Sequence, residues 1–226
     1  MTAPSVLLFA AGFGTRMGAL TADRPKPLIE VSGRPLIDHA LDLARAIDPP
    51  RIVANLHYRP QQLADHLAAR NVITTLEWPE ILETGGGLRN ALPLLGADPV
   101  ITLNPDVVWN GPNPLELLLK AWDPDKMDAL LVCLHPENAH GRMGAGDFDH
   151  DDNGALTRGT AVVYGGAQML KTDGLAEIPD TAFSLNLLWD RLIATGRLYG
   201  VTYPGTWCDV GRPEGIALAE ALIGNV

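Results

Sequence analysis

The chain has 226 residues, of which 46% are hydrophobic and 19% are charged. That apolar share supports a folded core and excludes a disordered polar chain. The formal net charge is −10, which argues against nucleic acid polymers and anionic membranes as partners, because both are bound by basic surfaces. The sequence has no long apolar run and no basic segment ahead of an apolar one, so we expect a cytoplasmic protein.

The first 134 residues alternate between short apolar runs and amphipathic segments. Strands are predicted at 6–9, 51–55, 72–76, 100–103 and 129–134. Helices are predicted between them, at 35–46, 60–69, 83–94 and 114–122. Such alternation is typical of a mostly parallel sheet with helices on both faces.

After residue 134 the pattern changes. Asp-Asn-Gly at 152–154 predicts a hairpin turn within 147–159. Further elements are predicted as strands at 160–164 and 198–203 and helices at 185–195 and 213–223. We therefore predict one domain over 1–226 with a three-layer α/β/α, Rossmann-like architecture. Its sheet is mixed and mostly parallel, and its C-terminal half adds a small antiparallel lid.

Two features that could suggest metal binding lack the required spacing. Cys133 and Cys208 belong to no metal-binding spacing, so buried reduced thiols are expected. The acidic stretch 149–154 resembles half of a calcium loop, but Thr160 stands where that loop needs glutamate. A solvated hairpin tip is the prediction for this stretch.

The most informative segment, 10–28, follows the first strand. Gly12 and Gly14 have no Cβ, so backbone N–H groups there can approach an anion closely. The segment also concentrates cations within an acidic chain, at Arg16, Arg24 and Lys26. These features predict a phosphate-binding loop.

Neither of two widespread glycine motifs describes this loop. The dinucleotide fingerprint needs a third glycine, where Met17 stands. The P-loop motif needs glycine directly before its lysine, whereas Lys26 follows Pro25. The loop must therefore bind phosphate in another way.

The loop resembles the signature of the sugar-nucleotide pyrophosphorylases, which are sugar-1-phosphate nucleotidyltransferases. It carries A-A-G-x-G-x-R-M, L-T and P-K-P-L within 10–28. Three more segments match the family: L-x-T-G-G at 82–86, N-P-D at 104–106 with proline in place of the family's glycine, and W-C-D-V-G at 207–211. Within the family, the chain is most similar to the short bacterial N-acetylmuramate 1-phosphate uridylyltransferases.

The resemblance implies a glycosyltransferase-A-like nucleotidyltransferase fold and a defined reaction. A nucleotidyl group passes from a nucleoside triphosphate, with UTP expected, to a sugar 1-phosphate, with N-acetylmuramate 1-phosphate or a related hexose expected. Residues 1–134 would bind the nucleotide, and 135–226 would form the sugar-binding half and lid. The attacking phosphate is already an anion, so positioning and charge neutralisation suffice, with no general base.

The resemblance also assigns roles to individual residues. Arg16 is expected at the β- and γ-phosphates, and Lys26 near the α-phosphate and the attacking phosphate. Asp106 and Asp209 are expected to hold Mg²⁺, a cation that prefers oxygen ligands. The other expected nucleotide contacts are Ala10, Ala11, Gly12, Gly14, Thr15, Thr84, Gly85, Gly86 and Asn104. The expected sugar contacts are Asp147, Gly165 and Ser184.

Alternatives remain open at this point. They are a mannose-1-phosphate guanylyltransferase or other sugar nucleotidyltransferase, a cytidylyltransferase acting on a phosphoalcohol, and a non-catalytic nucleotide-sugar-binding regulator. Joint presence of the four charged residues at 16, 26, 106 and 209 favours an enzyme. A monomer or weak homo-oligomer is expected. The residues do not determine the nucleobase or the sugar.

Overall fold

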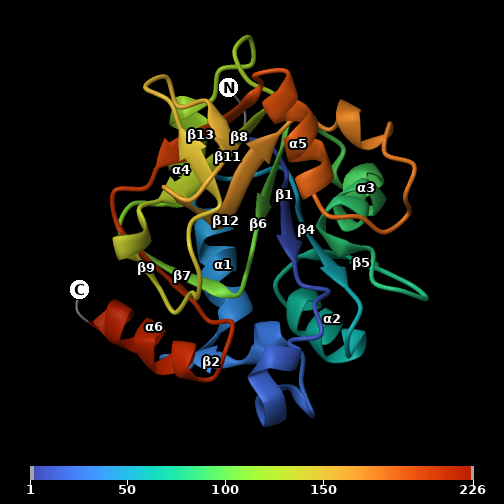
Figure 1. Cartoon of the computed structure of the whole chain (residues 1–226). Helices are drawn as coiled ribbons and strands as arrows, with labels where there is room; N and C mark the ends of the chain where they lie inside the picture. Colours follow the sequence, from blue (N-terminus) through green and yellow to red (C-terminus); the bar gives the residue numbers. More distant parts are fainter. Residues whose placement is uncertain (1–2, 225–226) are drawn as a thin grey trace.

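A seven-stranded sheet runs through the centre of the computed structural model, which describes residues 3–224 (Figure 1). Its strand order is β13-β8-β12-β6-β1-β4-β5. The strands are β1 (Val6–Phe9), β4 (Ile52–Leu56), β5 (Ile73–Leu76), β6 (Val100–Leu103), β8 (Ala129–Leu134), β12 (Val163–Leu170) and β13 (Leu198–Thr202). β12 is antiparallel to its neighbours β6 and β8, whereas the other pairs are parallel. The predicted mixed, mostly parallel sheet is confirmed.

Helices cover both faces of this sheet, as the alternation predicts. One face is covered by α1 (Leu36–Arg45), α2 (Pro60–Ala68) and α4 (Pro114–Ala121). The other is covered by α3 (Glu83–Leu95) and α5 (Asn186–Ala194). Successive strand residues point to opposite faces, so Val6 and Leu8 pack in the first core and Leu7 packs in the second. Three layers result.

A second, smaller sheet lies on the left of the molecule in Figure 1, below β8 and β12. In it β14 (Thr206–Asp209) pairs antiparallel with β7 (Val107–Asn110) and parallel with β9 (Ala139–His140). The C-terminal helix α6 (Glu214–Gly224) packs on it, and Val108, Cys208 and Ala219 belong to the shared core. This sheet therefore combines strands from both halves of the chain. The sequence analysis predicted none of its three strands, β7, β9 and β14.

The predicted hairpin is present between β10 (Phe148–His150) and β11 (Leu156–Arg158). Asp151 organises its tip, because one carboxylate oxygen accepts hydrogen bonds from the N–H groups of Asn153 and Ala155. The acidic stretch thus forms a turn. Across residues 3–224, no group of three or more potential metal-ligating side chains is present.

Two predicted stretches differ from the structure. Between the strand predicted at 6–9 and the helix predicted at 35–46, the sequence predicts only a phosphate-binding loop. The structure adds the 3₁₀ turns η1 (Thr15–Thr21) and η2 (Lys26–Leu28) and the strand β2 (Glu30–Val31), which pairs with β3 (Arg34–Pro35). β12, expected at 160–164, continues to Leu170 through a register shift beside Gly166, whose φ is +90°. Further 3₁₀ turns are η3 (Pro136–Asn138) and η4 (Asp173–Leu175).

Both cysteines are buried and form no disulfide, as predicted. Within the described chain, none of the helices combines the length and apolar character needed to cross a bilayer.

Candidate active site

Two adjoining cavities open at the edge of the sheet where β1, β4 and β6 end. Their volumes are about 300 and 210 Å³, and both are lined by Phe9, Gly12 and Asp106. Ligands of open α/β sheets bind at this edge, because the connections leaving the strands diverge there. The larger is called the phosphate cavity and the smaller the nucleoside cavity.

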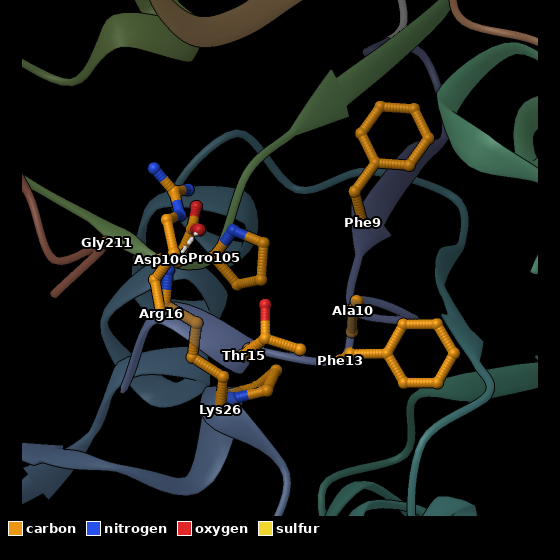
Figure 2. A pocket seen from close by; sticks show the side chains of 12 residues that line it. Phe9, Ala10, Phe13, Thr15, Arg16, Lys26, Pro105, Asp106 and Gly211 are labelled. Atoms are coloured by element: carbon orange, nitrogen blue, oxygen red, sulfur yellow. Dashed lines mark hydrogen bonds and ion pairs between the residues drawn. The ribbon is translucent and has the colours of Figure 1, made fainter. Parts of the chain in front are cut away.

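The glycine loop forms one side of the phosphate cavity, and Asp106 lines the opposite side (Figure 2). Its lining includes Ala10, Gly12, Gly14, Thr15, Arg16 and Lys26, all expected from the sequence. Gly14 has a φ of +64°, and a Cβ there would lie 2.8 Å from the Cβ of Lys26. A side chain at 14 would therefore displace the lysine.

Lys26 is the most constrained cation of the loop. Its side chain extends towards Asp106 (Figure 2), and Nζ lies 2.5 Å from Oδ2 of that residue. Only 7% of Lys26 is exposed, and the flanking prolines limit its backbone. Arg16 differs, because it is exposed and lines the cavity nearby. The site thus has one buried, positioned charge and one exposed charge.

Asp209 completes the charged cluster. The Val210 N–H donates to the Asp106 carbonyl at 3.0 Å, which brings the end of β14 beside the start of β7. Burial, and then the Asp106 carboxylate, raise the pKa of Asp209, while Lys26 and Arg16 act in the opposite direction. The two carboxylates therefore sit close enough to repel each other.

This donor set fits Mg²⁺. Two carboxylates held side by side are stabilised by a divalent cation between them, and Mg²⁺ commonly uses one or two carboxylates together with substrate phosphates. Gly211 also lines the cavity, and a Cβ there would lie 2.8 Å from a carboxylate oxygen of Asp209. Glycine at 211 therefore leaves room around the oxygens that would bind the metal.

The nucleoside cavity is lined in part by expected residues. These are Ala11, Gly12, Thr84, Asn104 and Asp106. Gly85 and Gly86 have another task, since both N–H groups donate to the Phe183 carbonyl, at 2.8 and 3.1 Å. A Cβ on Gly85 would lie 2.2 Å from the Phe183 ring. Their N–H groups thus help to pack α3 against the segment before α5, and neither glycine lines the nucleoside cavity. Their expected contact with the nucleotide stays a prediction.

Among the lining residues that the sequence analysis missed, two are buried and polar: Asn55 and Glu77. They lie at the end of β4 and just after β5. The available signal was an asparagine and a glutamate at predicted strand ends, where ligand sites form. Neither belongs to a motif, so the sequence alone did not distinguish them from turn residues.

The three expected sugar contacts line neither cavity. Asp147 pairs with Arg142 at 2.6 Å and accepts the Tyr164 N–H at 2.9 Å. The Gly165 carbonyl accepts the Trp207 indole N–H, and the Ser184 hydroxyl accepts the N–H of Asn186 at the start of α5. Each therefore has a partner within the protein.

Comparison with known proteins agrees with this geometry. Residues 6–166 match the model of the MobA-like NTP transferase domain. The chain is 38% identical to N-acetylmuramate alpha-1-phosphate uridylyltransferase of Caulobacter vibrioides, over 98% of each chain. It is 29% identical to the protein of that name from Neisseria meningitidis serogroup B, over 96% of this chain and 97% of the other.

The fold is shared with more distant structures. A putative glucose-1-phosphate thymidylyltransferase from Bacillus anthracis, solved with sucrose, superposes with a TM-score of 0.81 at 16% identity. The superposition covers 99% of this chain and 96% of that one. The sequence matches, the shared fold and the phosphate cavity together show that the chain belongs to the family of MobA-like NTP transferase domains and is a nucleotidyltransferase.

Proposed function

We propose that the chain transfers UMP from UTP to N-acetylmuramate 1-phosphate and releases pyrophosphate. The observation that carries this proposal is the ion pair between buried Lys26 and partly exposed Asp106, which line the phosphate cavity together with the glycine loop, with the Asp209 carboxylate nearby. The choice of nucleotide and sugar rests on the 38% identical relative, which matches along nearly its whole length.

The proposed chemistry needs positioned charge and no covalent intermediate. A phosphate oxygen of the sugar 1-phosphate attacks the α-phosphorus in line. A new P–O bond forms there, and the bond from the α-phosphorus to the oxygen bridging it to the β-phosphorus breaks. Both reactants are anions, so catalysis depends on aligning them and offsetting their charge.

Each part of the phosphate cavity has a role in this scheme. The backbone from Ala10 to Thr15 cradles the triphosphate, and exposed Arg16 contacts the leaving pyrophosphate. Lys26 holds its ammonium group at the α-phosphate and the incoming phosphate, at the place where charge develops. Asp106 and Asp209 would hold Mg²⁺, which when bound offsets phosphate charge.

The remaining contacts follow the two cavities. Thr84 and Asn104 would contact the nucleoside, with Gly85 and Gly86 supporting that wall from behind. The hexose would lie towards the segments that carry Asp147, Gly165 and Ser184. A cytoplasmic, monomeric or weakly self-associating enzyme is part of the same proposal.

A substrate matrix tests the proposal. Pyrophosphate release and nucleotide-sugar formation are measured with UTP, GTP, CTP and dTTP against the 1-phosphates of N-acetylmuramate, N-acetylglucosamine and mannose, with and without Mg²⁺. UTP with N-acetylmuramate 1-phosphate is expected to give the highest kcat/KM. A higher value for GTP with mannose 1-phosphate would reassign the substrates, and binding without turnover for every pair would overturn the enzyme.

A further inference from the structure

A chain of hydrogen bonds links the glycine loop to the segment that begins α3. The Ala10 N–H donates to Oδ1 of Asn55 at 2.8 Å. Nδ2 of Asn55 donates to Oε1 of Glu77 at 2.6 Å, and Oε2 of Glu77 accepts the Leu82 N–H at 2.7 Å. Two side chains therefore connect two backbone segments that line opposite parts of the nucleotide site. This pair is called the Asn55–Glu77 brace.

The brace is buried and closely fitted. Asn55 is 3% exposed and Glu77 is 0% exposed, so their polar atoms need protein partners. Gly87 on α3 provides the space, because a Cβ there would lie 2.5 Å from Oε1 of Glu77 and 2.8 Å from Nδ2 of Asn55. A buried carboxylate with both oxygens in hydrogen bonds has little freedom to move.

The order of donors and acceptors in the brace is fixed from both ends. The backbone N–H groups of Ala10 and Leu82 can only donate, so each must meet an acceptor. The two side chains must also bond to each other, which requires one N–H donor between them. One amide and one carboxylate satisfy this pattern, whereas two amides or two ionised carboxylates do not.

We propose that the Asn55–Glu77 brace sets the separation between the phosphate loop and the wall of the nucleoside cavity, and so positions the nucleoside triphosphate. Both side chains line that cavity between Ala11 and Thr84. Beyond Leu82 the connection continues, since its carbonyl accepts the Phe183 N–H at 3.1 Å. Asn55 and Glu77 are therefore positioning residues, and this inference rests on the proposed function.

A single substitution of either residue breaks the donor–acceptor pattern of the brace with almost no change in side-chain size. Glu77→Gln places an N–H₂ group against either Asn55 or Leu82, and rotating the Asn55 amide only moves the clash to Ala10. Asn55→Asp places two carboxylates against each other. Each single variant is expected to raise the KM for UTP at least about tenfold, because a buried group is left without a partner, with a smaller change in the KM for sugar phosphate.

The double variant Asn55→Asp with Glu77→Gln restores every hydrogen bond of the brace, because the carboxylate now stands at 55 and the amide at 77. The Ala10 N–H meets a carboxylate oxygen, the new amide donates to the other oxygen, and its carbonyl accepts the Leu82 N–H. The double variant is therefore expected to recover a KM for UTP within about threefold of the unchanged protein, a strongly non-additive result.

Gln168→Leu provides a matched control for loss of stability. Gln168 is a buried amide of the same sheet that bonds to Thr102 and Trp189 and lines neither cavity. The Gln168→Leu substitution is expected to lower Tm and to leave the KM for UTP unchanged. UTP binding by calorimetry and steady-state kinetics are measured on all variants alongside Tm.

The outcomes separate the two proposals. Raised KM for UTP in both single variants with recovery in the double variant supports the brace. Single variants that lose Tm but keep the KM for UTP would show that the pair only stabilises the fold. A double variant no better than the singles would also overturn the inference. If the protein without substitutions neither binds nor turns over any nucleotide, the proposed function is refuted, and the positioning role of the brace with it.

Discussion

Motifs predicted the cavity residues at the phosphate edge better than they predicted the expected sugar contacts in the C-terminal half of the chain. At the phosphate edge, most residues singled out by motif line a cavity, and Lys26 and Asp106 pair across it. In the C-terminal half, the expected sugar contacts Asp147, Gly165 and Ser184 are bonded to other parts of the protein. A phosphate cradle is made by consecutive backbone groups, so a local motif describes it. A sugar surface is assembled from distant segments, and a single residue type there has many possible tasks.

The largest effect is expected from Lys26→Ala. It removes the buried ammonium group placed beside Asp106, and kcat/KM is expected to fall by about 10² to 10³, as for loss of a positioned charge in a transition state. Steady-state kinetics with the best substrate pair from the matrix measures it. Lys171→Ala is the control, because Lys171 pairs with Asp128 away from both cavities and should leave kcat/KM nearly unchanged. A loss of less than about tenfold for Lys26→Ala would show that the lysine has a structural task.

Asp209→Asn is expected to separate activity from stability. Burial and the charge of Asp106 raise the pKa of Asp209, so the folded protein disfavours the charged form. A neutral side chain at 209 should therefore leave Tm unchanged or higher while the Mg²⁺ requirement increases at least about tenfold. Asp106→Asn should lower Tm, since it removes the carboxylate charge that pairs with buried Lys26. A Mg²⁺ titration and thermal unfolding measure both, and an unchanged titration for either variant would contradict its assignment as a metal ligand.

Gly165→Ala tests directly whether an expected sugar contact of the C-terminal half serves binding or packing. A Cβ there would lie 2.5 Å from Cη2 of Trp109 and 2.8 Å from a methyl group of Leu134. Such overpacking costs about 1–3 kcal/mol in the free energy of unfolding. The KM for the sugar 1-phosphate should change little if the residue serves packing. A changed KM without loss of stability would return Gly165 to the sugar site.

Local periodicity and glycine motifs were sufficient for most of the architecture. The strand–helix alternation to residue 134 predicts the main sheet, and the hairpin at 152–154 follows from turn chemistry. β7 was missed because its apolar residues follow a proline-containing loop directly and carry no period of their own. β12 was shortened because Gly165 and Gly166 signal a strand end, while pairing on both sides continues it through a bulge.

For the site, the sequence identifies residues that belong to a motif but not residues whose role depends on a distant partner. Arg16, Lys26, Asp106 and Asp209 follow from the family's motifs, and the structure brings them together. Asn55 and Glu77 do not follow from a motif, because their role depends on a hydrogen bond between the ends of two neighbouring strands. The same limit explains Gly85 and Gly86, whose N–H groups are used by a residue about a hundred positions away.

The smallest effect is expected at the edge of the sheet opposite the cavities, where Asp128 joins the two halves of the chain. Its carboxylate bonds to Arg197 and Lys171, and these bonds lower its pKa from 3.8 to about 2. The pKa is lower in the folded state, so the stabilisation is complete above about pH 4 and is lost as the pH falls through about 2. Asp128→Asn should therefore cost about 1 kcal/mol or less at pH 7, because the group is partly exposed.

The measurement is denaturant unfolding of both proteins at several pH values, with activity recorded at pH 7. The difference between the unchanged protein and the Asp128→Asn variant should disappear near pH 2 while kcat/KM at pH 7 stays the same. A difference that persists at pH 2 would mean that packing, not charge, is lost. The pKa shifts of Asp128 and Asp209 run in opposite directions. Asp128 bonds to two cations that stabilise its charged form, whereas Asp209 is buried near the Asp106 carboxylate, and both effects disfavour its charged form.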